Sequence, residues 1–372
     1  MKPSVASSSS GVTLRRMAVA WCALLAAANL LQGLGGGLAR LGWGDAAPGA
    51  LGLHGAVMVC GFFGALISLE RAVALRHAWG YAVPLLAGLG GLAAWAIGSA
   101  SLALGLWGLA SGGLVGLYLW AGHTRAWSLH LAVEALGAAC WGLGVAAWAL
   151  NAPEAALHAW MAFLVLTIAG ERRELMQMRR LPRGVRVGFV VMVGAALTAV
   201  LLGLADALAG TGGRAMATAI WWGACAALAV WLLRWDFAPR QWAAKQWPGH
   251  TAQCLCIGYG WLGIAALLGL AGLANVPTAT QAAGHALWLG FVFAMVFGHA
   301  PIILPALARV RPAYVAWARG AIVVLSASLV LRIVGLMAGH ASALSWAAAG
   351  HAVAIGWFAL AMVASMWTGT KA

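Results

Sequence analysis

The stretch QAAGHALWLGFVFAMVFGHAPIIL, residues 281–304, decides the fold. It runs for 24 residues without Asp, Glu, Lys or Arg. About 20 consecutive apolar residues cross the hydrocarbon core of a bilayer as a helix. We therefore expect a membrane-spanning helix here, one that carries histidine near each of its ends.

The rest of the chain has a similar composition. Of 372 residues, 63% are hydrophobic and only 8% are charged, which excludes an ordinary soluble domain, where about a quarter are charged. The apolar content also excludes a disordered chain. The 22 Lys and Arg against 8 Asp and Glu give a net charge of +14, but the basic residues lie in short loops. They are typical of membrane orientation signals, and we expect no nucleic-acid partner.

Apolar stretches long enough to span a membrane recur about twelve times between Gly, Pro and charged breaks. The sequence therefore predicts an all-α polytopic membrane bundle of about 12 transmembrane helices, in one domain over residues 14–368. Residues 1–13 are expected to form an N-terminal tail and residues 369–372 a short C-terminal end. The expected spans are residues 14–36, 51–69, 81–99, 102–121, 130–150, 153–171, 186–206, 215–234, 251–273, 281–304, 316–337 and 343–368.

The basic residues fix the expected orientation. If the N-terminus is inside, all of the 22 Lys and Arg fall on the inner side except Arg40, Arg214 and Arg332. Cytoplasmic loops attract Lys and Arg, so both termini are predicted to be cytoplasmic, in the inner membrane of a bacterium.

Histidines within the spans are candidate metal ligands, because ionisable groups in a bilayer are costly and mark functional or paired sites. His54, His158 and His285 are placed near the outer ends of their helices, and His351 somewhat deeper. Haem iron is commonly held by imidazoles of facing helices at one depth, which His54 and His285 satisfy. The alternative for each histidine is a hydrogen bond to a neighbouring helix.

His299 is expected near the inner end of the tenth helix, about 21 Å from His285 at 1.5 Å per residue. The two cannot share one site, so His299 is a separate candidate ligand. Pro301 follows it and removes a backbone donor, which bends the helix and frees a carbonyl. A kinked core helix with a hydrogen-bonded histidine is the alternative interpretation.

Glu134 lies well inside the fifth helix, one turn after His130. Residues at i and i+4 share a helix face, so the two are predicted to pair, either as a structural pair or as a proton relay with a catalytic role. Two further groups, Glu70 with Arg71 and residues 171–174, are interpreted as inner-surface ion pairs. Arg332, in the outer part of the eleventh helix, is expected to bind a haem propionate or to extend to the headgroups.

Two stretches resemble known families. His54, Gly55 and Met58 are similar to the low-spin haem ligand segment of haem-copper oxidase subunit I, and residues 297–301 (FGHAP) are superficially similar to that family's Phe-Gly-His-Pro. The adjacent His-His pair and the His-x-His of that family have no counterpart here. As a whole, the chain resembles the NnrS family of haem- and copper-containing bacterial membrane proteins linked to nitric oxide stress, which implies haem b and copper as cofactors.

The leading hypothesis is a membrane haem protein in redox or nitric oxide related chemistry, with a small-molecule or redox partner. A proton-coupled secondary transporter is the second hypothesis, supported by the helix count, the broken tenth helix and Glu134. An assembly partner of a respiratory complex is the third.

Overall fold

The computed structural model describes residues 7–44, 48–177, 179–274, 276–308 and 310–371, and they are almost entirely helical. The elements, with π- and 3₁₀-helices marked η, are α1 (Ser7–Ala39), α2 (Pro48–Ala56), η1 (Val57–Phe63), α3 (Gly64–Leu75), η2 (Ala78–Tyr81), α4 (Ala82–Trp95), α5 (Ala100–Arg125), α6 (Leu129–Ala149), α7 (Pro153–Leu175), α8 (Arg183–Ala209), α9 (Arg214–Trp235), η3 (Ala238–Gln241), α10 (Gln246–Gly272), α11 (Pro277–His285), η4 (Ala286–Val292), α12 (Phe293–Ala308), β1 (Val310–Arg311), α13 (Ala318–Ala338), α14 (Ala341–Thr368) and β2 (Thr370–Lys371).

Twelve helical segments of the described chain are long and apolar enough to cross a membrane, one for each expected span. The protein is an all-α, multi-pass membrane bundle, and this prediction is confirmed. The surface agrees, because large apolar side chains such as Val191, Leu267 and Leu360 are more than half exposed, as lipid-facing residues are. The first helix begins already at Ser7 rather than at residue 14, and residues 1–6 of the expected tail lie outside the described part.

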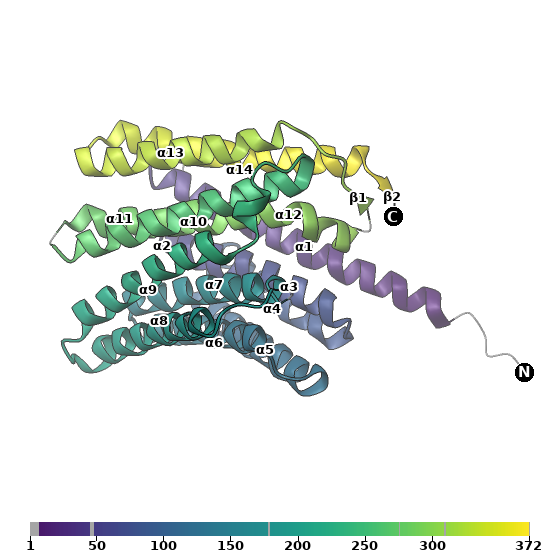
Figure 1. Cartoon of the computed structure of the whole chain (residues 1–372), viewed down its shortest axis with the longest axis horizontal. Helices are drawn as coiled ribbons and strands as arrows, with labels where there is room; N and C mark the ends of the chain where they lie inside the picture. Colours follow the sequence, from purple (N-terminus) through teal and green to yellow (C-terminus); the bar gives the residue numbers. More distant parts are fainter. Residues whose placement is uncertain (1–6, 45–47, 178, 275, 309, 372) are drawn as a thin grey trace, which may run out of the picture.

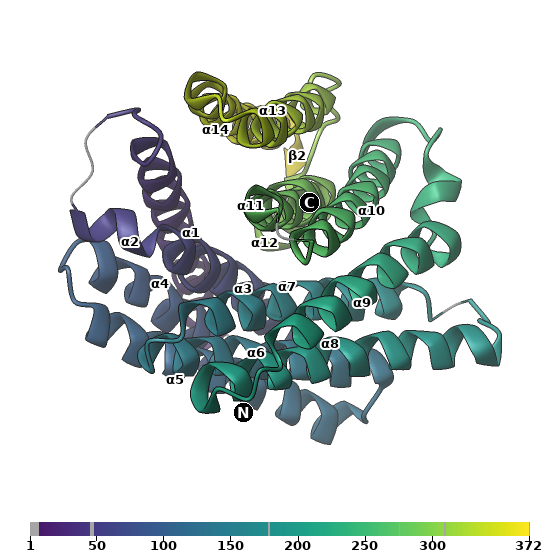
Figure 2. The ribbon, with the colours of Figure 1, turned by 90° about the vertical axis from the view of Figure 1, so that its left-hand side faces the viewer.

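The spans form a bundle with a peripheral hairpin (Figures 1 and 2). The hairpin of α13 and α14 lies on one side, and α4 to α9 form a broad layer on the other. The tenth span, α11–η4–α12, lies between them and contacts α10, α13 and α14. This central position buries most of residues 281–304.

Small residues let the helices approach closely. A Cβ atom added at Gly33 would lie 2.3 Å from the sulfur of Met58, and one at Gly37 would lie 3.0 Å from the ring of His54. Two glycines of α1 therefore make room for the second span at the position of its histidine.

The second and tenth spans are not continuous α-helices. Each contains seven residues of π-helix, η1 directly after α2 and η4 directly after α11. His54 lies three residues before η1, and His285 is the residue before η4. Wide turns of this kind are rare and often occur at functional sites.

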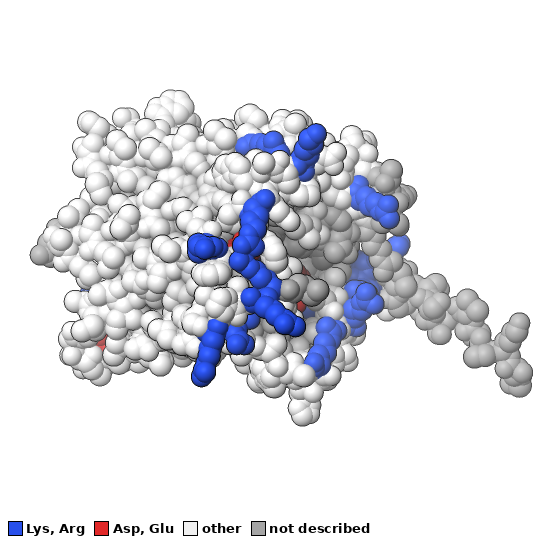
Figure 3. Space-filling model, in the orientation of Figure 1, with Lys and Arg blue, Asp and Glu red and all other residues white. Residues whose placement is uncertain are grey.

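The first and last described residues, Ser7 and Lys371, lie at one end of the bundle, and Lys and Arg gather toward the same end (Figures 1 and 3). A two-stranded pairing of β1 with β2 ties the C-terminus to the loop before α13, with Val310 opposite Lys371. We call this end of the molecule the basic end.

Candidate functional site

His54 and His285 are held in the same way. The Nδ1 of His54 lies 2.5 Å from the carbonyl oxygen of Gly33, and the Nδ1 of His285 lies 2.9 Å from that of Gln281. A carbonyl only accepts, so each ring donates its Nδ1–H and leaves the Nε2 lone pair available. This is how proteins orient histidines that ligate metals. Both rings are half-buried, so part of each stays uncovered by protein.

Two further polar side chains lie buried in the same part of the bundle. Arg332 of α13 and His351 of α14 are 7% and 5% exposed. The hydroxyl of Ser328 donates to the carbonyl of Leu325 and lies 2.8 Å from the Nδ1 of His351. The ring therefore donates to Ser328, and its Nε2 carries a lone pair. Within the described part of the chain, that Nε2 and the Nε of Arg332 have no hydrogen-bond partner.

These four side chains are connected by electrostatic interactions through His285 and Arg332. His285 lies within electrostatic range of Arg332, His351 and His54, and His54 within range of Arg332. We call them the histidine cluster: His54, His285, Arg332 and His351. The structure thus groups three of the five predicted ligands with Arg332, the arginine predicted to bind a propionate.

The other two predicted ligands lie elsewhere. His158 donates from Nδ1 to the carbonyl of Glu154 on its own helix, and Glu154 pairs with Arg214 at the start of α9. His299 lies in α12, beyond η4 and toward the basic end. It donates from Nδ1 to the carbonyl of Met295 and accepts at Nε2 from Arg172, at 3.2 Å.

Arg172 belongs to a buried network that the sequence analysis did not predict. Its Nε and Nη2 donate to both carboxylate oxygens of Asp236, at 3.1 and 2.9 Å. The hydroxyl of Tyr259 and the amide of Phe237 donate to the same carboxylate. A single Asp directly after a span was the available signal, because a carboxylate at that depth requires a cation.

The predicted pair of His130 and Glu134 is not formed. Arg71 donates to Glu134 at 2.6 Å instead, while His130 lies 3.0 Å from the Ser128 hydroxyl, 3.1 Å from the Gln177 amide nitrogen and 3.9 Å from Glu174. Sharing a helix face was not enough, because the interhelical neighbour carries a full charge and a fork of donors.

Glu70 and Glu171 lie within electrostatic range of Arg71, and Glu171 lies within range of Glu134. We call Glu70, Glu134 and Glu171 the carboxylate cluster. It lies on α3, α6 and α7, near the basic end.

Phenylalanines separate the histidine cluster from the buried groups of the basic end. Phe63 of η1 packs edge-on against Phe293 at 5.4 Å, and Phe293 contacts Phe297 at 6.4 Å. Phe297 stacks on Phe358 of α14 at 4.2 Å. These rings are nearly fully buried, and we call them the phenylalanine layer: Phe62, Phe63, Phe293, Phe297 and Phe358.

Side chains of α10 bond to the tenth span just before its first proline. Pro301 has no N–H for the carbonyl of Phe297, and the Nε2–H of His250 donates to that oxygen at 3.2 Å. Thr251 donates to the next carbonyl, that of Gly298, at 2.8 Å. The carbonyls that a proline exposes are therefore satisfied by a neighbouring helix.

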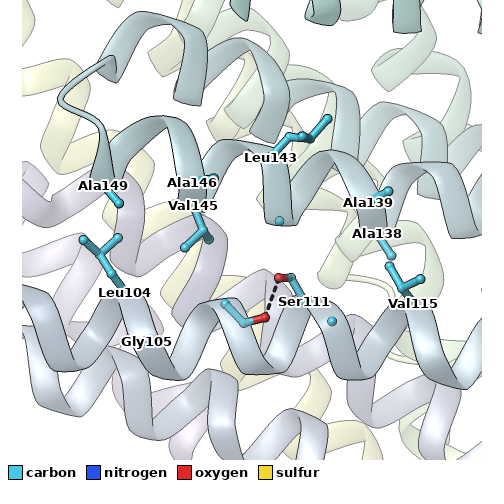
Figure 4. Close-up of a pocket in the computed structure, with 13 residues that line it drawn as sticks. Leu104, Gly105, Ser111, Val115, Ala138, Ala139, Leu143, Val145, Ala146 and Ala149 are labelled. Atoms are coloured by element: carbon cyan, nitrogen blue, oxygen red, sulfur yellow. Dashed lines mark hydrogen bonds between the residues drawn. The ribbon is translucent and has the colours of Figure 1, made fainter. Parts of the chain in front are cut away.

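A separate hollow of about 690 Å³ lies between α5 and α6 (Figure 4). Its walls are apolar, and the hydroxyl of Ser111 bonds within its own helix to the carbonyl of Gly108 at 2.9 Å. It offers no group for polar chemistry and does not belong to either cluster.

Across the described residues, no three His, Cys, Asp or Glu side chains lie close enough to hold a metal ion together. A copper site with three such ligands therefore has no counterpart there, whereas a haem iron needs only two axial ligands.

Fold and buried groups together define a multi-pass α-helical membrane protein with polar sites at two depths. The chain belongs to the family described as a domain of unknown function, DUF8744, whose model matches residues 16–367. No curated protein and no solved structure matches the chain.

Proposed function

We propose that the protein is a membrane haem protein that works in redox or nitric oxide related chemistry, with one haem b ligated by His54 and His285. We place it in the inner membrane of a bacterium with both termini in the cytoplasm, because the basic end carries the termini and most of the Lys and Arg. A small-molecule or redox partner would meet the haem from the opposite end of the bundle.

The observation that carries the proposal is that the two histidines have the same protonated nitrogen and the same kind of hydrogen bond. Each ring has its Nδ1–H committed to a backbone carbonyl and its Nε2 free to ligate. They come from spans far apart in sequence, lie within electrostatic range of each other, and each is followed closely by a π-helix. Two available Nε2 atoms on separate spans are what a pair of axial haem ligands requires.

Arg332 and His351 fit the same ligand. The Nε of the buried Arg332 guanidinium has no hydrogen-bond partner among the described residues, so an anion could bind there. Arg binds carboxylates well, and a haem propionate is a carboxylate. The Nε2 of His351 can accept a hydrogen bond from a protonated group or a water beside it. Bound haem would supply one-electron chemistry, while the chain holds the imidazoles, balances the propionate charge and excludes bulk water.

Copper remains a second candidate cofactor on resemblance alone, because no described three-residue cluster supports it. The link to nitric oxide rests on the same resemblance.

The test is the visible spectrum of the protein purified after expression with ample haem. We expect a reducible Soret and α band of a six-coordinate haem b. His54→Ala and His285→Ala should each lose the haem or turn it five-coordinate. His158→Ala is the matched control, because His158 has the same Nδ1 bond to a carbonyl but lies on α7. Unchanged spectra in the two cluster variants would contradict the assignment.

The transporter hypothesis has one observation in its favour, the interrupted tenth span with its proline at the basic end. Broken helices provide binding sites in many transporters. Protein that carries no haem despite ample supply, and that moves a solute in a proton-dependent way, would favour this second function.

A further inference from the structure

The carboxylate cluster carries more negative charge than its surroundings balance. Glu70, Glu134 and Glu171 lie within electrostatic range of the same cation, Arg71. Arg172, the next cation, lies within range of Glu171 but is matched by Asp236 in a bidentate pair. With every carboxylate ionised, the three glutamates would share one positive charge.

The centre of this cluster is closed to water. The side chain of Glu134 has no exposed surface, and that of Arg71 is 14% exposed. Gly170 of α7 lies so close that an added Cβ would be 2.5 Å from the Cγ of Glu134. Burying an unbalanced carboxylate costs several kcal/mol, so such groups neutralise themselves or bind a cation.

Two buried atoms at this place have unused hydrogen-bonding capacity. Glu134 uses Oε2 for Arg71, but its Oε1 has no partner among the described residues. The hydroxyl of Tyr118, a fully buried residue of α5, is also unpartnered there, and its ring lies 5.0 Å under the guanidinium of Arg71. Tyr118 lies within electrostatic range of Glu134.

Other charged groups face the cluster from its rim. Glu174 and Arg173 follow Glu171 on α7, and His130 precedes Glu134 by one turn on α6. His130 and Glu174 lie 3.9 Å apart, and Glu174 is 45% exposed. Glu174 also lies within electrostatic range of Glu70 and Glu134, so an exposed carboxylate lies near the cluster.

We propose that the carboxylate cluster binds an exchangeable proton, held on Glu134 or shared with Glu70 and Glu171, which it takes up from the basic end. The proton sits on a carboxylate oxygen and removes one unbalanced charge. When Oε1 of Glu134 is protonated, it becomes a hydrogen-bond donor. The unpartnered hydroxyl of Tyr118 can act as a hydrogen-bond acceptor or donor. The site is separate from the histidine cluster and does not depend on the presence of haem.

The experiment is infrared spectroscopy of the full-length protein in lipid, near pH 7, in H₂O and in D₂O. We expect the carbonyl stretch of a protonated carboxylic acid, shifted to lower frequency in D₂O, in haem-loaded and haem-free protein alike. Glu134→Gln, Glu171→Gln and Glu70→Gln should each remove or shift this band. Glu154→Gln is the matched control, because Glu154 is 62% exposed and lies at the opposite end of α7.

A wild-type spectrum without such a band near pH 7 would overturn the proposal, and this measurement needs no variant to fold. A band that is unchanged in all three glutamine variants would overturn it too. A band that appears in choline chloride and disappears in sodium chloride would show that the cluster binds a metal cation in place of the proton, which also contradicts the proposal as stated.

Discussion

The histidine cluster and the carboxylate cluster solve the problem of polar groups in a membrane in opposite ways. At the carboxylate cluster, the Oε2 of Glu134 and the guanidinium of Arg71 form a direct ion pair. At the histidine cluster, the Nε2 of His351 and the Nε of Arg332 stay without partners among the described residues. Buried polar groups in native proteins are usually satisfied. The first site has a cation for one of its carboxylates and leaves the Oε1 of Glu134 and the hydroxyl of Tyr118 open to a proton, whereas the second leaves a guanidinium nitrogen and an imidazole nitrogen open to a ligand.

The largest effect should come from breaking the ion pair at the carboxylate cluster. Arg71→Ala leaves the fully buried Glu134 without its cation, and losing one partner of a buried pair costs about 3–5 kcal/mol. We expect a loss of that order in the free energy of unfolding, measured by reversible denaturation in mild detergent. Arg214→Ala, which breaks the exposed pair with Glu154, should cost only about 0–1 kcal/mol. Equal losses in the two variants would remove the contrast between buried and exposed pairs.

The second prediction tests how α1 supports the histidine cluster. A Cβ at Gly37 would lie 3.0 Å from the ring of His54, while one at Gly35 would meet nothing within 4 Å. Gly37→Val should displace the imidazole and lower haem affinity by roughly tenfold to a hundredfold, as loss of an orienting contact does. Gly35→Val, on the same helix, should leave the haem content unchanged. Haem titration followed by absorbance measures both, and equal affinities would show that His54 is not held from α1.

A smaller effect is expected from the charge of Arg332. Arg332→Gln removes a buried cation near the proposed haem, so the reduced state loses stabilisation. The midpoint potential should fall by tens of millivolts, where about 59 mV corresponds to a tenfold change in the equilibrium constant of a one-electron reduction. Arg214→Gln is the control at the same end of the bundle, and its potential should match the wild type. If a spectroelectrochemical titration gives Arg332→Gln the same midpoint potential as the wild type, an arginine that extends to the headgroups is favoured.

The smallest effect concerns the hydrogen bond between His351 and Ser328. Ser328→Ala removes the hydroxyl at 2.8 Å from Nδ1 and should cost about 1 kcal/mol of stability, the usual contribution of one hydrogen bond. Ser326→Ala, two residues earlier, affects the Trp261 contact and leaves His351 alone. A Soret band that shifts in Ser328→Ala but not in Ser326→Ala would connect His351 to the haem pocket. Identical stability and spectra in both would leave the hydrogen bond without consequence.

The sequence was sufficient for the spans and for much of the histidine cluster. Apolar length and the placement of Lys and Arg are one-dimensional properties, so twelve helices and the shared depth of His54, His285 and Arg332 could be read from them. The π-helices could not, because η1 and η4 have the same apolar composition as an α-helix. The depth of Glu134 could be predicted. Its partner depends on how α3 and α6 are rotated against each other, and residue spacing within one helix holds no information on that rotation. The pairing of Asp236 with Arg172 could not be predicted for the same reason, since the two residues are 64 positions apart.

The phenylalanine layer has an electrical consequence. His285 and His299 are separated by fourteen residues, about 21 Å along the span, and the apolar rings of Phe293 and Phe297 lie in that interval. A transmembrane voltage acts on any charge that crosses this interval, at up to about 2.3 kcal/mol per elementary charge and 100 mV. An electron delivered from the basic end to the haem proposed at the histidine cluster would traverse this field and charge the membrane, whereas one delivered from the opposite face would not cross it.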